Sequence, residues 1–588
     1  MIHTLRRHRR HVSLALVALL SSWQISQPLQ AVTLYWDGST SGAWNVTTNW
    51  NLAANGSGAA PANTTTATDD LFFFATGALN TTTQTLGANR TARSLTFGSG
   101  VTSALGISGS TLTLTPTGTG LTATGVAIDM TGAGADVSIT SAVTLGADQT
   151  WLLGTGRTLT IGSFTADGTD DLVVDGAGTL SLGNTTDNSY GIGIITLQNG
   201  ATLLNTQDNT FGDTTTIINM TSGTTWDKGG FGDAFRGLTG TGSVINAGNL
   251  DLRTLTGETL TFSGSVTGPT TADLVKQGQA NLGTQVIAGD VNFQDQLLVY
   301  SGTLSLANAN GAANQIVGTL LMGRSDTTTV RDVAVPYSTL RLDSSVANHV
   351  TQNRLHDDEE VQFRSTGHLH MIGNGLAATT EATGPLNIAE SNGVDSNAVI
   401  TLEDGGAGLT LTADSLIRSA GSTLLLRGSN LGTGAAGPGV ARLLFDVTVP
   451  TITGTLGTPT AGIVPGILGD HSLTGQGAGF VTYDVNGLRL LQASEMVSSF
   501  AGLGQNVKLE ANQTLAGNAN DLTAHLAGAG VTLDLGGNVL SLAGASILSS
   551  GTAPATITNG TINFGAATEG FIYTVNDLTL NATITGDT

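Results

Sequence analysis

The densest group of side chains that could do chemistry lies between Arg354 and His370. It contains His356, His368 and His370 around a run of four carboxylates at 357–360. His368 and His370 are two residues apart, so on a strand they would share one face and could bind a metal with an Asp or Glu from an adjacent strand. A solvated turn is the more typical setting of a carboxylate run. We therefore predict that the chain binds no metal and no cofactor. If a metal were bound, these three histidines would be the candidate ligands.

Adjacent carboxylates offer a second possible chemistry. A β-helical lyase or glycosidase needs carboxylates that converge in one groove beside Arg, Lys or Ca²⁺. Neighbouring residues on a strand point to opposite faces, which argues against such convergence. We expect turn residues or acidic caps, and no catalytic residue, at the four pairs: Asp69–Asp70, Asp170–Asp171, Asp357–Asp358 and Glu403–Asp404.

Three tryptophans, Trp36, Trp44 and Trp50, stand close together near the start of the chain. They could form a platform on which sugars stack. An uncovered strand edge invites aggregation, so we expect instead an N-terminal Trp-rich cap over residues 32–60 that covers the first coil. Walker, H-E-x-x-H and G-x-S-x-G motifs are absent from the sequence.

The elements that must position these residues are short strands. Apolar residues alternate with Thr or Ser over four to six positions and are followed by Gly, Asn or Asp, as in Gly109–Leu114, Gly178–Leu182, Gly302–Leu306 and Gly530–Leu535. This period of two predicts half-buried strands and an all-β chain. Strands this short must stack on their neighbours, which predicts a parallel β-helix, or β-solenoid, over 61–588. Leu533 and Leu535 should then lie in its core and Thr532 should face solvent.

The composition argues against nucleic-acid binding, disulfide bonds and disorder. The net charge is −22 and only 11% of residues are charged, so the chain has no basic stripe with which to bind nucleic acid. Cysteine is absent, so no disulfide can staple the fold. Hydrophobic residues make up 39% of the chain and are regularly spaced, which is enough to build a core. This composition argues against a disordered chain.

The first 31 residues have the layout of a secretory signal peptide. Four arginines between Arg6 and Arg10 precede an apolar run, Val12–Leu20, and Ala31 closes the polar stretch that follows. The apolar run is too short to cross a membrane, which takes about 20 residues. An Arg9-Arg10 pair leaves twin-arginine export open beside the Sec route.

Several segments resemble a known family, the autotransporter-associated β-strand repeat, also called the passenger-associated transport repeat, of large bacterial exported proteins. The resemblance lies in Leu172–Leu182 with Asn199–Leu203, in Leu274–Gly278 through Tyr300–Leu306, and in the opening Leu34–Gly38. It implies a right-handed parallel β-helix displayed at, or released from, the surface of a Gram-negative-type bacterium, and no catalytic residues. No outer-membrane barrel or sorting tail is recognisable near Thr588, so we expect the repeats to continue and the translocation or anchoring device to lie outside this sequence.

Two functions from different classes remain. The first is a non-enzymatic exported or cell-surface passenger protein with a stalk, matrix or adhesive role, whose partners would be surface polysaccharide or other cells. The second is a β-helical polysaccharide-active enzyme, a lyase or glycoside hydrolase. Acidic residues gathered in one groove with an Arg or Lys would favour the enzyme, and scattered ones would favour the stalk.

Overall fold

The computed structural model describes residues 32–116, 125–166, 168–183, 191–211, 215–269, 271–278, 282–293, 295–307, 318–323, 338–345, 354–388 and 395–586. The expected signal peptide, 1–31, lies outside these residues. The chain divides into two compact units, Met1–Gly178 and Thr179–Thr588. Apart from two short 3₁₀ helices, η1 (Thr47–Asn49) and η2 (Ala493–Glu495), every regular element described is a strand. No helix in this part of the chain is long and apolar enough to cross a membrane.

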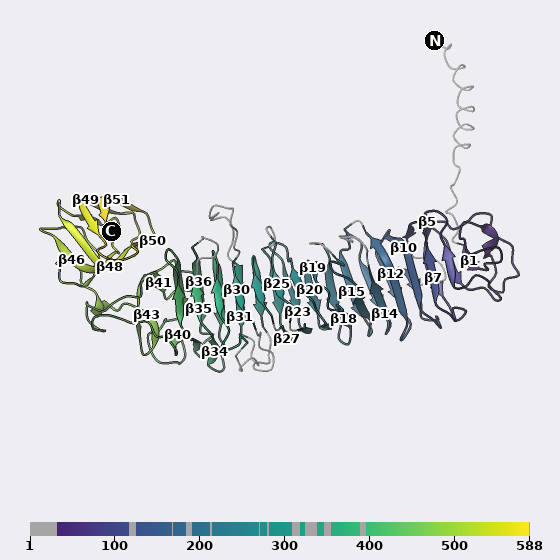
Figure 1. Cartoon of the computed structure of the whole chain (residues 1–588), viewed down its shortest axis with the longest axis horizontal. Coiled ribbons are helices and arrows are strands. Elements are labelled where there is room, and N and C mark those ends of the chain that lie inside the picture. The colour runs from purple at the N-terminus through teal and green to yellow at the C-terminus, as the bar shows by residue number, and fades with distance from the viewer. Residues whose placement is uncertain are drawn as a thin grey trace, which may run out of the picture. The chain divides into compact units, whose positions relative to one another are not determined.

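In the first unit the strands stack in parallel as two ladders (Figure 1). The first ladder consists of β1 (Thr33–Trp36), β3 (Asp70–Phe73), β6 (Ser94–Phe97), β9 (Val126–Asp129), β11 (Gln149–Leu152) and β13 (Leu172–Asp175). The second consists of β4 (Thr83–Thr85), β7 (Leu105–Ser108), β5 (Arg90–Ala92), β8 (Leu112–Leu114), β10 (Val137–Leu145) and β12 (Thr158–Thr165).

The three N-terminal tryptophans are buried in this unit. Strand β2 (Trp50–Asn51) runs antiparallel to β1 and covers the edge that β3 leaves free. Trp36, Trp44 and Trp50 are 0%, 0% and 1% exposed, and the Trp50 ring packs edge-on against the other two at 5.0 and 5.4 Å between centroids. With their faces in the core, these rings cannot serve as a sugar-stacking platform.

The second unit begins with three parallel ladders. The longest contains β15 (Ile194–Gln198), β17 (Ile217–Met220), β20 (Gly237–Gly240), β23 (Thr259–Phe262), β26 (Thr284–Ile287), β29 (Thr303–Leu306), β31 (Ser338–Asp343), β33 (Gly367–Ile372), β36 (Asn397–Glu403), β39 (Thr423–Gly428) and β41 (Ile467–Asp470). The second contains β14 (Thr179–Leu182), β16 (Thr202–Asn205), β18 (Thr225–Asp227), β21 (Ser243–Ile245), β24 (Ser265–Thr267) and β27 (Val291–Asn292). The third contains β19 (Asp233–Phe235), β22 (Leu250–Leu252), β25 (Leu274–Lys276), β28 (Leu297–Val299), β30 (Leu320–Met322), β32 (Val361–Phe363), β35 (Leu386–Ile388) and β38 (Leu416–Arg418).

Further along, a short ladder and an antiparallel turn follow. The ladder is β34 (Thr379–Thr383), β37 (Leu409–Ala413) and β40 (Ala441–Phe445). Strands β42 (Gly479–Asp484) and β43 (Gly487–Leu490) then run antiparallel, β42 against β41 and β43 against β42. Parallel stacking resumes in two C-terminal ladders, β44 (Asn506–Leu509), β46 (Ala519–Leu526), β48 (Val539–Ser549) and β50 (Phe571–Thr574), and β45 (Gln513–Thr514), β47 (Thr532–Asp534), β49 (Ala555–Asn563) and β51 (Leu578–Thr585).

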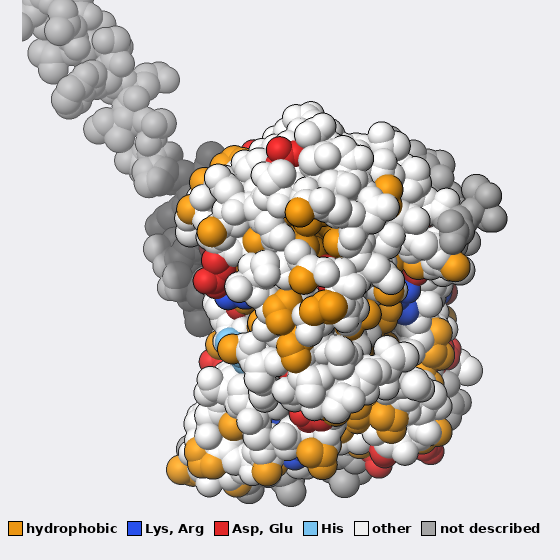
Figure 2. Space-filling view, turned by 90° about the vertical axis from the view of Figure 1, so that its left-hand side faces the viewer, with side chains coloured by type: hydrophobic (Ala, Val, Ile, Leu, Met, Phe, Trp, Pro, Cys, Tyr) orange, Lys and Arg blue, Asp and Glu red, His pale blue; other side chains and the backbone are white. Residues whose placement is uncertain are grey.

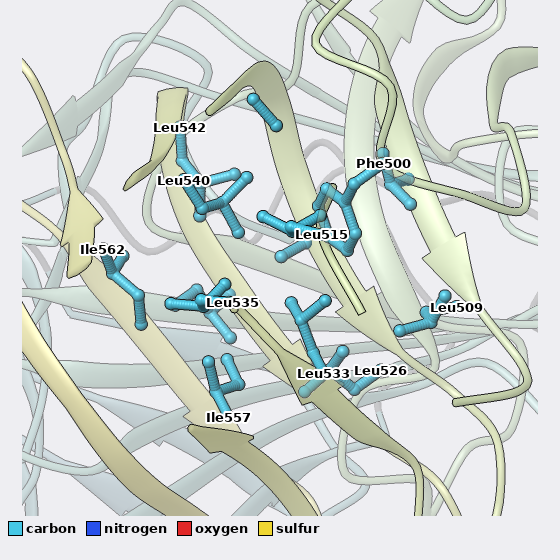
Figure 3. Packing of buried hydrophobic residues seen from close by; sticks show 14 of the residues in the cluster. Phe500, Leu509, Leu515, Leu526, Leu533, Leu535, Leu540, Leu542, Ile557 and Ile562 are labelled. Atoms are coloured by element: carbon cyan, nitrogen blue, oxygen red, sulfur yellow. The ribbon is translucent and has the colours of Figure 1, made fainter. Parts of the chain in front are cut away.

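Alternation within each strand builds the core, as the sequence predicts. In the C-terminal ladders, Leu533 and Leu535 are both 0% exposed and lie in one packed cluster with Leu526, Ile557 and Ile562 (Figure 3), while Thr532 is half-buried. Each strand is one rung of its ladder, and Leu533 of β47 pairs in register with Ile557 of β49, the next rung. The predicted core residues are confirmed, and so is the stacked parallel β architecture.

Turns between strands rely on Gly and Asn for backbone geometry and on Asn or Asp for hydrogen bonds. Asn199 and Gly200 have φ of 56° and 86°, the left-handed region that these two residues tolerate best. At Gly264, an added Cβ would overlap the carbonyl of Gly242 one rung away. Turn side chains also bind the following turn: Oδ1 of Asn249 accepts the N–H of Asp273 at 3.1 Å.

Candidate functional site

The two closely spaced histidines lie on one outward face of strand β33. Their rings are parallel, 7° apart in plane and 5.7 Å between centroids, so the sequence prediction that they share a face is confirmed. Arg341 of β31 lies in register with His370, and Thr401 of β36 lies in register on the other side. Arg341, His370 and Thr401 thus form a row of polar side chains across the outer face of the ladder.

Hydrogen bonds already occupy both ring nitrogens of His368. Nδ1 lies 3.3 Å from the Thr339 hydroxyl and Nε2 lies 2.9 Å from the Thr401 hydroxyl. Burial, reinforced by the nearby positive charges of His370, Arg427 and Arg341, lowers the pKa of His368 to about 3. His368 is therefore neutral at pH 7 and is held in place by hydroxyls.

His370 faces a carboxylate. Its Nε2 lies 3.5 Å from Oε2 of Glu403. Burial and the charge of Arg341 lower the pKa of His370, whereas Glu403 and Asp343 pull it upward. Both histidines are thus partly shielded from solvent by β31 and β36, the strands on either side of β33, and do not lie in a solvated turn.

His356 does not join this pair. It lies in a turn before β32, where its Nδ1 accepts the N–H of Asp358 at 3.3 Å. In the described ranges, no three His, Cys, Asp or Glu side chains come together in a way that could hold a metal ion. The structure brings two of the three candidate ligands together and leaves the third apart.

The adjacent carboxylates are used in two different ways. Asp357 and Asp358 lie exposed in a turn, as expected. In the pair Glu403–Asp404, Glu403 ends strand β36 and faces His370, so the turn prediction was wrong for it. Asp404 belongs to a turn, where it accepts the N–H groups of Gly406 and Gly439 at 2.9 and 2.8 Å.

The pair Asp69–Asp70 differs from the expectation. Asp69 closes a turn by accepting the N–H of Thr66 at 2.7 Å. Asp70 lies in strand β3, is 3% exposed, and forms an ion pair with the buried guanidinium of Arg93 and a hydrogen bond with Ser94. The turn prediction was wrong for Asp70, because a partner one rung away compensates the burial of its charge.

A cleft of about 610 Å³ opens in the second unit between β50 and the last rungs of the longest ladder. Leu468 and Tyr573 belong to a hydrophobic cluster with Phe480 and Leu548. The side chains that give the cleft its chemistry are Thr423, Gln476, Glu569, Phe571 and Tyr573. Figure 2 views the molecule from the side of the C-terminal strands, a face with hydrophobic side chains near its middle and few charges.

One carboxylate stands among the described residues that line this cleft. Glu569 forms an ion pair with Arg418 and accepts the N–H of Gly421. Arg418 lowers the pKa of Glu569, and the guanidinium also lies 5.0 Å from the centre of the Phe571 ring. A second carboxylate facing Glu569, as a two-carboxylate glycoside hydrolase uses, is absent from the described lining of this cleft.

Two aromatic rings form one wall of the cleft. Phe571 and Tyr573 alternate along β50 and stack with 5.8 Å between centroids and 6° between planes. The Tyr573 hydroxyl is buried without a hydrogen-bond partner among the described residues, and burial raises its pKa. Such a hydroxyl is a donor that a ligand could satisfy.

Sequence reasoning missed this cleft. The Phe-Ile-Tyr alternation at 571–573 was visible as a strand pattern, but Arg418 precedes Glu569 by 151 residues, and nothing in the sequence connects the two.

No family model, curated protein or solved structure matches the chain. The resemblance to the autotransporter-associated repeat therefore rests on the short motifs alone.

Proposed function

We propose that this chain is a non-enzymatic, exported β-helical passenger protein with an adhesive or matrix role at the surface of a Gram-negative-type bacterium. Its strands would wind as a right-handed parallel β-helix of the autotransporter-associated repeat type. The observation that carries the proposal is how the charged side chains of the second unit are used. Arg418, Arg489 and Arg236 pair with carboxylates of the same unit, and acidic residues such as Asp404 close turns.

Neutral polysaccharide is the ligand class that the cleft suits best. Aromatic rings offer apolar faces to sugar C–H groups, and amides and hydroxyls pair with sugar hydroxyls. Tyr573 supplies a ring and Ile572 an exposed apolar side chain, while Thr423 and Gln476 supply the polar groups. Phe571 is buried beneath Arg418 and supports the Tyr573 ring. The single carboxylate, Glu569, is neutralised by Arg418, so the cleft does not select a charged ligand.

Binding can be tested with purified residues 32–588 in gels that contain neutral or acidic polysaccharides. We expect at least one neutral polysaccharide to retard the protein. Tyr573→Ala should weaken its affinity about tenfold or more, as loss of a buried aromatic contact usually does. Tyr35→Ala, which changes a tyrosine of the first unit, is the matched control and should leave binding unchanged.

The same polysaccharides, incubated with the protein, separate adhesion from catalysis. We expect no new reducing ends and no unsaturated sugar products. Either product would establish the lyase or glycoside hydrolase in place of the adhesive role, and a panel without any binding would remove the cleft as a polysaccharide site.

Export can be tested by fusing residues 1–40 to a reporter enzyme that is active only outside the cytoplasm. We expect activity that is lost when Val12–Leu20 is deleted. Replacement of Arg9 and Arg10 with lysine distinguishes the routes, because twin-arginine export requires the arginine pair and Sec export does not.

A further inference from the structure

A lysine is sealed inside the second unit close to the start of its ladders. The Lys228 side chain is 0% exposed, and its Nζ has no hydrogen-bond acceptor among the described residues. Nζ lies 3.9 Å from Oδ2 of Asp233 and 4.9 Å from the centre of the Trp226 ring. Burial of an ammonium group without a hydrogen-bond acceptor costs free energy of folding. A reaction that removes the charge of Lys228 would relieve that cost.

Burial makes the amine reactive. Desolvation lowers the pKa of Lys228 from 10.5 to about 8, although Asp233 and Asp208 oppose that change. A lysine with its pKa near neutrality has an appreciable fraction of free amine, which is a nucleophile.

An amide stands beside this amine on the preceding rung. Strands β16 and β18 pair in register up to Leu204 and Asp227, and the next residues along each strand are Asn205 and Lys228. Residues paired across parallel rungs lie about 4.8 Å apart at their backbones. Because Leu203 and Trp226 point into the core, the alternation also directs Asn205 and Lys228 inward.

Neighbouring groups polarise the Asn205 amide. The indole N–H of Trp226 donates to Oδ1 at 3.0 Å. Nδ2 donates to Oδ2 of Asp233 at 2.7 Å, the same oxygen that faces Lys228. The other Asp233 oxygen accepts the N–H of Phe211 at 3.0 Å.

The surroundings exclude water. Asn205 and Asp233 are 1% and 3% exposed, and the rings of Phe211, Trp226 and Phe235 around them are 0% exposed. The centroids of Phe211 and Phe235 lie 5.7 and 5.0 Å from that of Trp226. An amine, an amide and a carboxylate that touches the amide are thus held in a dry aromatic pocket.

We propose that Lys228 and Asn205 join in an intramolecular isopeptide bond that links two adjacent rungs. The neutral Nζ attacks Cγ of Asn205, and the Nζ–Cγ bond forms. Asp233 takes a proton from Nζ and passes it to the amide nitrogen, the Cγ–Nδ2 bond breaks, and ammonia leaves. The Trp226 N–H donates to Oδ1, where negative charge develops during the attack. The reaction consumes no oxidant and no cofactor.

This bond would serve a chain that has no cysteine. A covalent link between rungs restricts the unfolded chain as a disulfide does. The inference is independent of the polysaccharide-binding proposal, since the pocket is sealed and forms no part of the cleft.

Mass spectrometry of the purified chain tests the bond directly. We expect the intact mass to be lower than the sequence mass by one ammonia. The chain contains three lysines, Lys228, Lys276 and Lys508. A lysine-specific protease should cut the denatured protein after Lys276 and Lys508 but not after Lys228. Asn205 and Lys228 then remain in one peptide, and a second digestion at aspartate, which cuts between them at Asp208, should release a branched peptide joined through Asn205 and Lys228.

Variants identify the roles of the three groups. Asn205→Ala and Lys228→Met should restore the full mass expected for each variant. Asp233→Ala keeps both reacting groups and should also lack the bond. Lys276→Met is the matched control, because Lys276 is equally buried but its Nζ lies 3.5 Å from the Ser301 carbonyl; this variant should keep the loss of ammonia.

Each remaining outcome is decisive for the wild-type chain. Cleavage after Lys228 together with the full sequence mass would overturn the proposal. Loss of one water would place the bond on the Asp233 carboxyl and overturn the assignment to Asn205. Loss of ammonia without a branched peptide would indicate a succinimide at an Asn-Gly step, such as Asn199-Gly200, and would also overturn it.

Discussion

At the scale of single residues, buried charges in this protein persist because hydrogen bonds surround them. Glu495 is 0% exposed, and Arg489 donates to its two carboxylate oxygens at 2.7 and 2.8 Å. The backbone N–H groups of Gln492 and Gly457 add two bonds at 2.8 Å. Burial alone would raise the pKa of Glu495, but the effect of these donors is larger and lowers the pKa from 4.5 to about 2.

Removing that carboxylate should destabilise the region around η2. Glu495→Gln replaces one carboxylate oxygen with an amide N–H₂ group that faces buried donors, while Asp484 still pairs with Arg489. A buried donor left without its acceptor typically costs about 1 to 3 kcal/mol. The folded-state pKa is depressed, so the contribution is present above the unfolded value near 4.5 and is lost as pH falls toward about 2. Urea unfolding at pH 7 and pH 3 should show a large difference between wild type and variant at pH 7 and a smaller one at pH 3.

His368 should make its own strand sensitive to acid. Its folded pKa of about 3 lies below the unfolded value of 6.5, so the unfolded chain binds the extra proton first. Stability contributed by the neutral ring is therefore present above about pH 6.5 and is lost as pH falls toward about 3. Hydrogen exchange of β33 should accelerate between pH 7 and pH 5, after correction for intrinsic rates, and His368→Asn should reduce that acceleration. His356→Asn, in the turn before β32, should not; equal effects of the two changes would contradict the role of burial.

At the scale of elements, the ladder explains which substitutions should matter. Leu533 of β47 is 0% exposed and pairs with Ile557, whereas Thr532 beside it is half-buried. Leu533→Ala should cost about 2 to 5 kcal/mol in the C-terminal ladders because it leaves a cavity. Thr532→Ser should cost less than about 1 kcal/mol. Hydrogen exchange of β47 and β49 measures both, and a similar cost for the two substitutions would contradict the inward and outward assignment.

Alternation made the strands predictable, but it could not say which rungs stack. Short strands such as Thr532–Asp534 follow from period-two patterning alone. Rung spacing varies with the turns between strands: Thr303 pairs with Thr339, whereas Thr284 pairs with Thr303. Cross-rung partners cannot therefore be counted off the sequence, which is why the Asp70–Arg93 ion pair was missed.

At the scale of the whole molecule, the absence of cysteine means that no disulfide contributes to the stability, and the stacking of strands is its main source. In stacked repeats, each rung contacts its neighbours, so stability is approximately a sum of local terms. The described strands fall into two compact units, each with its own buried core. A local defect should therefore remain local.

Leu533→Asp tests this locality. The charged side chain would lie in the cluster that includes Leu515, Leu535 and Ile557, where an unpaired charge cannot be solvated. We expect the C-terminal ladders to open while the strands of Met1–Gly178 keep their protection, because no rung of that unit depends on Leu533. Limited proteolysis followed by mass spectrometry should place the early cuts between residues 497 and 585, and Thr532→Ser, the matched control, should resist cleavage as wild type does. Simultaneous cleavage in both units would show one cooperative folding unit and would contradict a stability made of neighbouring rungs.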